Sequence, residues 1–473
     1  MQNKVVIIDN GIDDGLLCKD LETAIFINNS GKVRKDRVKR KDKAFQHGTI
    51  CALILEKHCP NCILSSIRIL DEEGKGAVDK IEPALEWCYQ NNVKIVNLSL
   101  GTTHFGEYSK LNKLINKYVY RGLIIVAAVS NTGFFTFPAS FTNVIGVATV
   151  ESPLPYAKDY IHLGIDTAVP SEHMIVLGGK EHKTSLSNSY AAPYATALVN
   201  KEIIENGTCN IQKLKKFVRE KSHIPMVDNL YNPDWVYMAY MQNKRNESKA
   251  DYYFETVRGS YEKNKQNIDT IIVYSKSELE QINMENKNLI YLGNEDIQNI
   301  HISGFKWSWQ TRVQQIVNNQ YRGNGLEVPL IILDLAESLD KYFILSKFRD
   351  LFGNDGYNAY TVSMEPESVL HRIEYIPDIQ MPLTDQLVAD FIEGQVYYKQ
   401  SDLILWNVSK NQKSNINRLY PDCDVEILFN EGEIFVYIEK NIIYKQAYVD
   451  LTEECIRTIY DMLVSCMAEE ENE

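Results

Sequence analysis

The chain has 473 residues, 44% of them hydrophobic, and its formal net charge is −13. This length exceeds what one hydrophobic core holds, so we expect at least two domains. The acidic balance argues against nucleic acid as a partner, no apolar run is long enough for a membrane span, and nine irregularly spaced cysteines suggest no disulfide framework.

The chain starts with a β-branched run, Lys4 to Ile8, which leads into an acidic turn at Asp9. Such a run predicts a buried parallel strand that delivers the Asp9 carboxylate to the carboxyl edge of a sheet. Because so few residues precede Asp9, we expect neither a secretory signal nor an inhibitory pro-segment. The expected location is therefore cytoplasmic.

Two later segments carry candidate catalytic side chains. His47 stands just before an apolar run that continues to Leu55. Ser189 lies in the stretch 187–193, Ser-Asn-Ser-Tyr-Ala-Ala-Pro, which predicts a helix with proline in its first turn. A serine at such a position can aim its hydroxyl into a cleft instead of the core.

The chain order of these residues, Asp9, His47 and Ser189, resembles the triad of the subtilisin-like serine peptidase family (peptidase S8). The segments around them are similar to that family in succession: 67–71, 74–76, 81–92, 93–101, 122–131, 137–139 and 144–148. The resemblance implies an α/β fold over residues 1–225, with a parallel sheet and helices on both of its faces.

The resemblance also implies acyl transfer. An unassisted serine is a poor nucleophile, so His47 would accept the Ser189 proton while Asp9 orients the imidazole. Asn131 would donate its side-chain amide to the oxyanion, and the Ser189 N–H would be the second donor. Taken singly, Asp9 could cap a turn, His47 could be a core histidine and Asn131 could begin a turn.

A peptide or protein substrate would bind as an extended strand, because the segment 98–101 resembles the platform on which the family's substrates pair. The residues expected to bind it are Leu98, Ser99, Leu100, Gly101, Ala127 and Ala128. No cofactor is expected. No metal ligand set or calcium loop is recognisable, since Cys59 and Cys62 lack the second pair that a zinc site would need.

Several positions near the candidate site depart from the family pattern. Ser187-Asn188 stands where Gly-Thr is commonest, Tyr194 where His is commonest, and Ile50 and Leu53 where His and Gly are usual. None of these positions is a triad member. The departures suggest altered packing near the cleft, and they leave room for a slow or inactive enzyme.

Beyond the catalytic segment we expect a linker over 226–250, an accessory α/β domain over 251–380 and a small α+β region over 381–473. The accessory domain contains no glycine-rich turn of the P-loop kind. The segment 341–360 faintly resembles clostridial peptide-maturation proteins. A structural or dimerisation role for this half is the open alternative.

The sequence thus predicts a subtilisin-like serine endopeptidase that processes ribosomally made precursor peptides by removing a leader. One alternative is a catalytically inactive binding or regulatory protein on the same fold. Another is a general intracellular housekeeping protease. The P1 preference and the oligomeric state stay open.

Overall fold

The computed structural model describes residues 2–36, 47–71, 73–151, 163–177, 179–223, 230–243, 248–378, 381–408, 413–421 and 423–470. The chain divides into two compact units, Met1–Tyr237 and Met238–Glu473. Within the described ranges, no helix has the length and apolarity that crossing a bilayer demands.

The first unit is built on an eight-stranded sheet in the order β3-β2-β4-β1-β5-β6-β7-β8. All neighbours are parallel except β2 and β3. The strands are β1 (Lys4–Asp9), β2 (Thr23–Ile27), β3 (Val33–Lys35), β4 (Ile63–Arg68), β5 (Ile95–Leu98), β6 (Ile124–Ala128), β7 (Ile145–Thr149) and β8 (Ile165–Val169). The continuous burial of β1, β5, β6 and β7 is what a parallel sheet covered on both faces requires.

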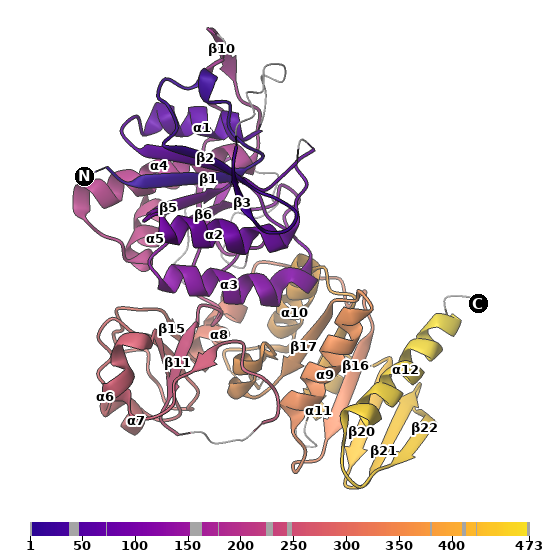
Figure 1. Cartoon of the computed structure of the whole chain (residues 1–473). Coiled ribbons are helices and arrows are strands. Elements are labelled where there is room, and N and C mark those ends of the chain that lie inside the picture. Colours follow the sequence, from indigo (N-terminus) through magenta and orange to yellow (C-terminus); the bar gives the residue numbers. More distant parts are fainter. Residues whose placement is uncertain are drawn as a thin grey trace. The chain divides into compact units, whose positions relative to one another are not determined.

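Helices cover both faces of this sheet (Figure 1). One apolar core joins the sheet to α1, α4 and α5, while α2 and α3 lie on the opposite side (Figure 1). The bounds are α1 (His47–His58), α2 (Ile81–Gln90), α3 (Tyr108–Tyr120), α4 (Asn188–Asn206) and α5 (Ile211–Glu220). The predicted α/β fold with helices on both faces is confirmed for this unit.

The direction of the strands decides where side chains meet. In a parallel sheet all carboxyl ends share one edge, so the ends of β1, β5 and β6 are neighbours there. Helices α1 and α4 both begin near this edge, because His47 faces Asp9 at the end of β1 and Ser189 contacts Ser99 just after β5. A two-stranded hairpin, β9 (Met174–Leu177) and β10 (Lys180–Lys183), comes shortly before α4 in the chain.

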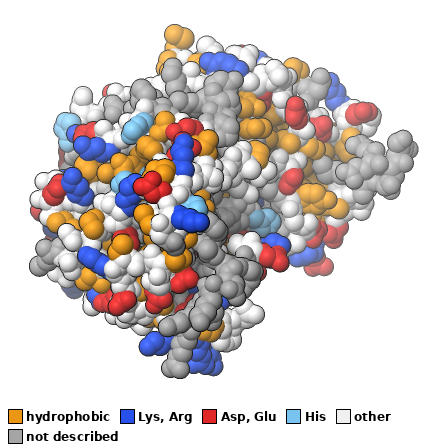
Figure 2. Space-filling view, turned by 90° about the horizontal axis from the view of Figure 1, so that it is seen from above, with side chains coloured by type: hydrophobic (Ala, Val, Ile, Leu, Met, Phe, Trp, Pro, Cys, Tyr) orange, Lys and Arg blue, Asp and Glu red, His pale blue; other side chains and the backbone are white. Residues whose placement is uncertain are grey.

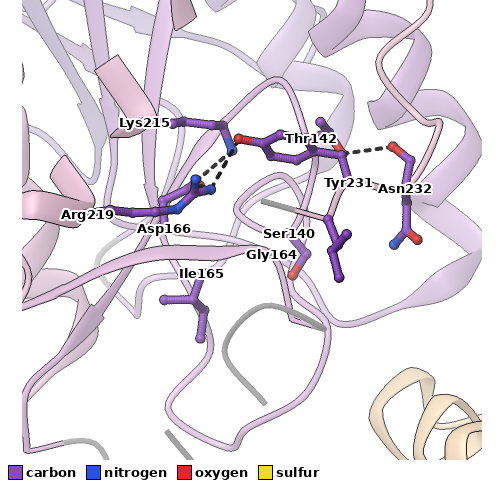
Figure 3. A pocket seen from close by; sticks show the side chains of 10 residues that line it. Ser140, Thr142, Gly164, Ile165, Asp166, Lys215, Arg219, Tyr231 and Asn232 are labelled. Carbon is purple, nitrogen blue, oxygen red and sulfur yellow. Dashed lines mark hydrogen bonds and ion pairs between the residues drawn. The ribbon is translucent and has the colours of Figure 1, made fainter. Parts of the chain in front are cut away.

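The opposite edge of the sheet holds a buried ion cluster beside a small cavity of about 30 Å³ (Figure 3). Asp166, near the start of β8, accepts from Lys215 Nζ and from Arg219 Nη2, each at 2.6 Å. Burial lowers the pKa of the Lys215 ammonium, but its partner keeps the buried charge satisfied. A cavity of this size has room for only about one or two water molecules.

The second unit contains two sheets. The first has five parallel strands in the order β12-β11-β13-β14-β15. Its elements are β11 (Met238–Met241), β12 (Glu255–Thr256), α6 (Tyr261–Asn264), β13 (Thr270–Val273), α7 (Lys276–Glu280), β14 (Asn288–Tyr291), β15 (Lys306–Trp307) and α8 (Trp309–Asn318).

The other sheet has seven strands in the order β18-β17-β19-β16-β20-β21-β22, antiparallel only at β20-β21-β22. One core joins it to α9 and α12, and a second core joins it to α8, α10 and α11. Its elements are β16 (Leu330–Leu335), α9 (Lys341–Asn354), β17 (Ala359–Ser363), β18 (Glu374–Tyr375), α10 (Asp385–Lys399), β19 (Leu403–Val408), α11 (Lys413–Leu419), β20 (Val425–Asn430), β21 (Glu433–Ile438), β22 (Asn441–Ala447) and α12 (Glu453–Glu470).

The second half differs from the predicted division in two ways. Strand β11 occupies part of the predicted linker 226–250, of which 226–229 and 244–247 lie outside the described residues. The seven-stranded sheet also crosses the predicted boundary at 380, because β19 inserts between β16 and β17. The change of sheet instead falls between β15 and β16.

The surface carries charges of both signs. On the face shown in Figure 2, acidic and basic side chains are interspersed with hydrophobic ones among the described residues.

Candidate active site

The first part of the candidate site is the pair of Asp9 and His47. The Asp9 side chain is 1% exposed and accepts the Asn10 backbone N–H at 2.7 Å. Nδ1 of His47 lies 2.8 Å from Asp9 Oδ2 and 3.0 Å from Oδ1. Because Nδ1 faces a carboxylate, we assign the ring proton to it, and Nε2 is then the proton acceptor. This arrangement is that of a general base and its orienting acid.

Gly48 sets how closely α1 approaches the end of β1. Its backbone N–H donates to Asn10 Oδ1 at 3.0 Å. A Cβ at this position would lie only 2.5 Å from the Gly11 carbonyl oxygen and 3.1 Å from Asp9 Cβ. Any larger residue would therefore push α1, and with it His47, away from Asp9.

Ser189 is the second residue of α4 and is half-buried. Its Oγ donates to the Ser99 carbonyl oxygen at 3.1 Å. A hydroxyl has a single proton, so in this arrangement the proton is donated to Ser99 and not to His47. Catalytic hydrogen bonds often tighten only when substrate binds, so this geometry is compatible with a nucleophile at rest.

Two contacts show where Ser189 lies relative to Asp9 and His47. The His47 ring stacks on the ring of Tyr190, the next residue after Ser189, with centroids 5.4 Å apart. Cys51 Sγ lies 3.6 Å from the Ser189 carbonyl oxygen and within 4.8 Å of ligand atoms of Asp9 and His47. Asp9 and His47 are therefore in direct contact, and the start of α4 with Ser189 lies beside them at the carboxyl edge of the sheet.

The group of Asp9, His47 and Cys51 also has the composition of a metal site. Burial and the charge of Asp9 raise the pKa of the Cys51 thiol well above its usual range, so the thiol is neutral unless a metal ion displaces its proton. The contact with Asp9 already uses Nδ1 of His47, so a metal ion and this contact would compete for the same atoms.

Ser99 was predicted to bind substrate, but its side chain faces inward and is 4% exposed. Its Oγ donates to the Ser189 carbonyl oxygen at 2.8 Å and accepts from Asn97 Nδ2 at 3.0 Å. Asn97 Oδ1 in turn accepts from Thr196 Oγ1 at 2.9 Å. This series of buried hydrogen bonds fixes the first turns of α4. The sequence contains one signal for it, because Asn97 is the one polar residue in the apolar strand β5.

The other predicted substrate-binding residues differ in exposure. The side chains of Leu98, Ala127 and Ala128 are buried, so they can contribute only through their backbone. Leu100 is half-buried and Gly101 is exposed. Pairing of a peptide along 98–101 stays a prediction.

Asn131 lies just after β6 and is exposed. Its Oδ1 accepts the Asn188 backbone N–H at 3.0 Å. The amide is thereby oriented, and Nδ2, its donor end, is the part left for a substrate oxygen. The second predicted donor, the Ser189 N–H, is occupied by the helix-capping Ser187 Oγ at 3.3 Å.

Residues 2–273 of the chain match the profile of the subtilase family (peptidase S8). This match covers more than half of the chain. The chain belongs to the subtilase family.

The match to individual subtilases is partial. The chain is 33% identical over 94 residues to the thermostable alkaline protease of Halalkalibacterium halodurans, covering 20% of this chain and 26% of that protein. It is 28% identical over 150 residues to Subtilisin BL of Lederbergia lenta (30% and 55%) and 26% over 215 residues to the minor extracellular protease Epr of Bacillus subtilis (41% and 31%). The chain thus spans about half or less of the length of these curated relatives.

A solved structure of a cold-adapted subtilisin-like serine proteinase aligns with a TM-score of 0.38 at 18% identity. The alignment covers 48% of this chain and 85% of that one.

This subtilase departs from the family pattern at Ile50, Leu53 and Tyr194, and the structure places these side chains in one apolar cluster. The cluster also contains Ile175 and Leu177 of β9. The departures therefore compensate one another in the packing between α1, α4 and the hairpin.

Proposed function

We propose that this subtilase is a serine endopeptidase that cleaves peptide bonds through an acyl-enzyme on Ser189. The observation that carries the proposal is the bifurcated hydrogen bond from His47 Nδ1 to both oxygens of the Asp9 carboxylate, beside a serine at the start of α4. A carboxylate that holds the imidazole in one tautomer, next to a helix-terminal serine, is the arrangement that makes a hydroxyl nucleophilic.

The reaction follows from these positions. Rotation of the Ser189 side chain away from Ser99 presents Oγ to His47 Nε2, which takes the proton as Oγ attacks the scissile carbonyl. The imidazolium is stabilised by Asp9, and it then protonates the leaving amine. Asn131 Nδ2 would donate to the oxyanion, and water would hydrolyse the acyl-enzyme with His47 again as base.

Hydrolysis of a set of peptide p-nitroanilides, followed with purified full-length chain, tests this proposal. Release of nitroaniline that is absent in the Ser189→Ala variant supports it. Absence of release with every peptide, from folded protein, would contradict it.

The pH dependence of kcat/KM follows from the environment of His47. Burial lowers the pKa of this imidazole, but the hydrogen bond and the charge of Asp9 raise it, and the net effect raises the pKa from that of a free histidine. His47 must be neutral to accept the serine proton, so kcat/KM is expected to rise with pH through an apparent pKa higher than that of a free histidine. A pH series of initial rates measures it, and a pH-independent rate between pH 5 and pH 8 would count against His47 as base.

The variant Asn131→Ala is expected to lower kcat by about 10²–10³-fold with little change in KM, the loss known when the oxyanion asparagine of a subtilisin is removed. The physical reason is that an oxyanion donor acts on charge that develops only in the transition state. Steady-state kinetics check this, with the neighbouring exposed Thr132→Ala as the matched control. Wild-type kcat in the Asn131→Ala variant would remove the oxyanion role.

We further propose that the substrates of this peptidase are precursor peptides from which it removes a leader. Support comes from the second unit, Met238–Glu473, which is as large as the subtilase unit and offers further surface for recognising one substrate. Digestion of casein distinguishes this role from a housekeeping protease. Few or no casein fragments, together with turnover of short peptides, favour precursor processing, whereas extensive degradation of casein contradicts it.

One observation favours the alternative of a catalytically inactive protein. The Ser189 backbone N–H, which is the expected second oxyanion donor, already donates to Ser187 Oγ. Removing this acceptor in Ser187→Gly is expected to raise kcat about fivefold, the equivalent of about 1 kcal/mol for one neutral hydrogen bond. Glycine at a helix N-cap costs only a few tenths of a kcal/mol in stability. Comparison of kcat for Ser187→Gly, Ser187→Ala and the natural chain checks this; a lower kcat in both variants would show that the cap supports catalysis.

A further inference from the structure

Asn188 is the first residue of α4 and lies directly before Ser189. It is 1% exposed, and its side chain uses both ends of its amide. Nδ2 donates to the carbonyl oxygens of Ser130 at 2.9 Å and Val129 at 3.2 Å. Oδ1 accepts the backbone N–H of Thr149, the last residue of β7, at 2.8 Å. One side chain therefore connects α4 to the segments that follow β6 and end β7.

These contacts converge on Asn131. The two carbonyl groups that the Asn188 side chain binds belong to the two residues immediately before Asn131. The Asn188 backbone N–H meanwhile holds Asn131 Oδ1 at 3.0 Å. Residue 188 thus sets both the backbone path into Asn131 and the orientation of its amide.

We infer that Asn188 is a positioning residue that fixes the Asn131 amide relative to the Ser189 nucleophile. This inference rests on the proposed function. It also explains the departure from the family pattern at this position. Threonine has a single hydroxyl donor, whereas the asparagine amide donates to two carbonyl oxygens at once.

A double-mutant cycle separates positioning from a purely structural role. The variants are Asn188→Thr, Asn131→Ala and the combination, and kcat is expressed per active site by titration with a fluorophosphonate. A small displacement of a catalytic group can cost up to about 10²-fold, so Asn188→Thr is expected to lower kcat roughly tenfold with KM unchanged. In the Asn131→Ala background, Asn188→Thr should lower kcat less than about twofold, because the amide that Asn188 positions is absent.

Equal losses in both backgrounds would overturn the inference, and so would an unchanged kcat in Asn188→Thr. The matched control is Asn143→Thr, since Asn143 is also buried and donates to Asn116 Oδ1 and to the Trp235 carbonyl oxygen. Any decrease in kcat that Asn143→Thr causes should be the same with and without Asn131→Ala. Asn188→Ser repeats the cycle if Asn188→Thr does not fold. Inactivity of the natural chain itself would instead refute the proposed function, which keeps the two failures distinct.

Discussion

Replacing Ser189 with alanine is expected to lower kcat for peptide hydrolysis by about 10⁶-fold, the loss known when the serine of a subtilisin triad is removed. Alanine cannot attack the scissile carbonyl, and the rate that is left comes from the oxyanion donors and substrate binding. The fold should persist, because the backbone of residue 189 keeps its contacts with Ser99 Oγ and Cys51 Sγ. Steady-state hydrolysis and thermal unfolding of the same preparation measure the two effects separately.

The matched control is Ser185→Ala, which makes the same chemical change four residues earlier at an exposed position. Its kcat should equal that of the natural chain. Turnover of Ser189→Ala at more than a trace of the natural rate would contradict the assignment of the nucleophile.

Replacing Asp9 with asparagine is expected to lower kcat by about 10⁴-fold near neutral pH, a loss known for the same change in a serine peptidase triad. The amide keeps the shape of the side chain, but it cannot stabilise the imidazolium and no longer selects the tautomer with the proton on Nδ1. Without the Asp9 charge, the factors that raise the pKa of His47 also disappear. The apparent pKa of the remaining activity should therefore fall.

The control for this variant is Asp20→Asn, which removes a carboxylate from an exposed position in the same unit. It should change neither kcat nor the pH profile. An Asp9→Asn variant with reduced kcat but an unshifted pH profile would mean that Asp9 acts only as a packing residue.

The subtilase unit could be predicted from its sequence because its signals are local. The β-branched run at Lys4 to Ile8 forms β1, and the Ser-Asn-Ser stretch forms the start of α4 with Ser187 as its cap. The prediction of proline in the first turn is wrong, because Pro193 is the sixth residue of α4 and lies inside the helix. In the second half, helices and strands are both present as the expected α/β and α+β classes require, but the grouping of the strands into sheets was not predictable. Strand β19 pairs between β16 and β17, and such pairing depends on contacts between residues far apart in the chain.

The candidate site shows the same limit at the scale of single side chains. A match of residue type and order predicted Asp9, His47 and Ser189 as a triad; the structure shows His47 in contact with Asp9 and with Tyr190, the neighbour of Ser189. The sequence could not predict that the Ser99 side chain turns inward and donates to Ser189, because the direction of a side chain after a strand end depends on what packs around it. From the sequence, Asn188 was only a departure from the subtilase pattern. Its buried hydrogen bonds to Val129, Ser130 and Thr149 are what indicate a positioning role.

The central claim is that Asp9, His47 and Ser189 act together to make Ser189 nucleophilic. Labelling of the full-length chain with a fluorophosphonate, followed by peptide mapping with mass spectrometry, tests it most directly. The account predicts stoichiometric phosphonylation of Ser189 Oγ, with a labelling rate that rises with pH through the pKa of His47 and drops sharply in His47→Ala. A folded chain that stays unlabelled, or that carries the label on another serine, would contradict it.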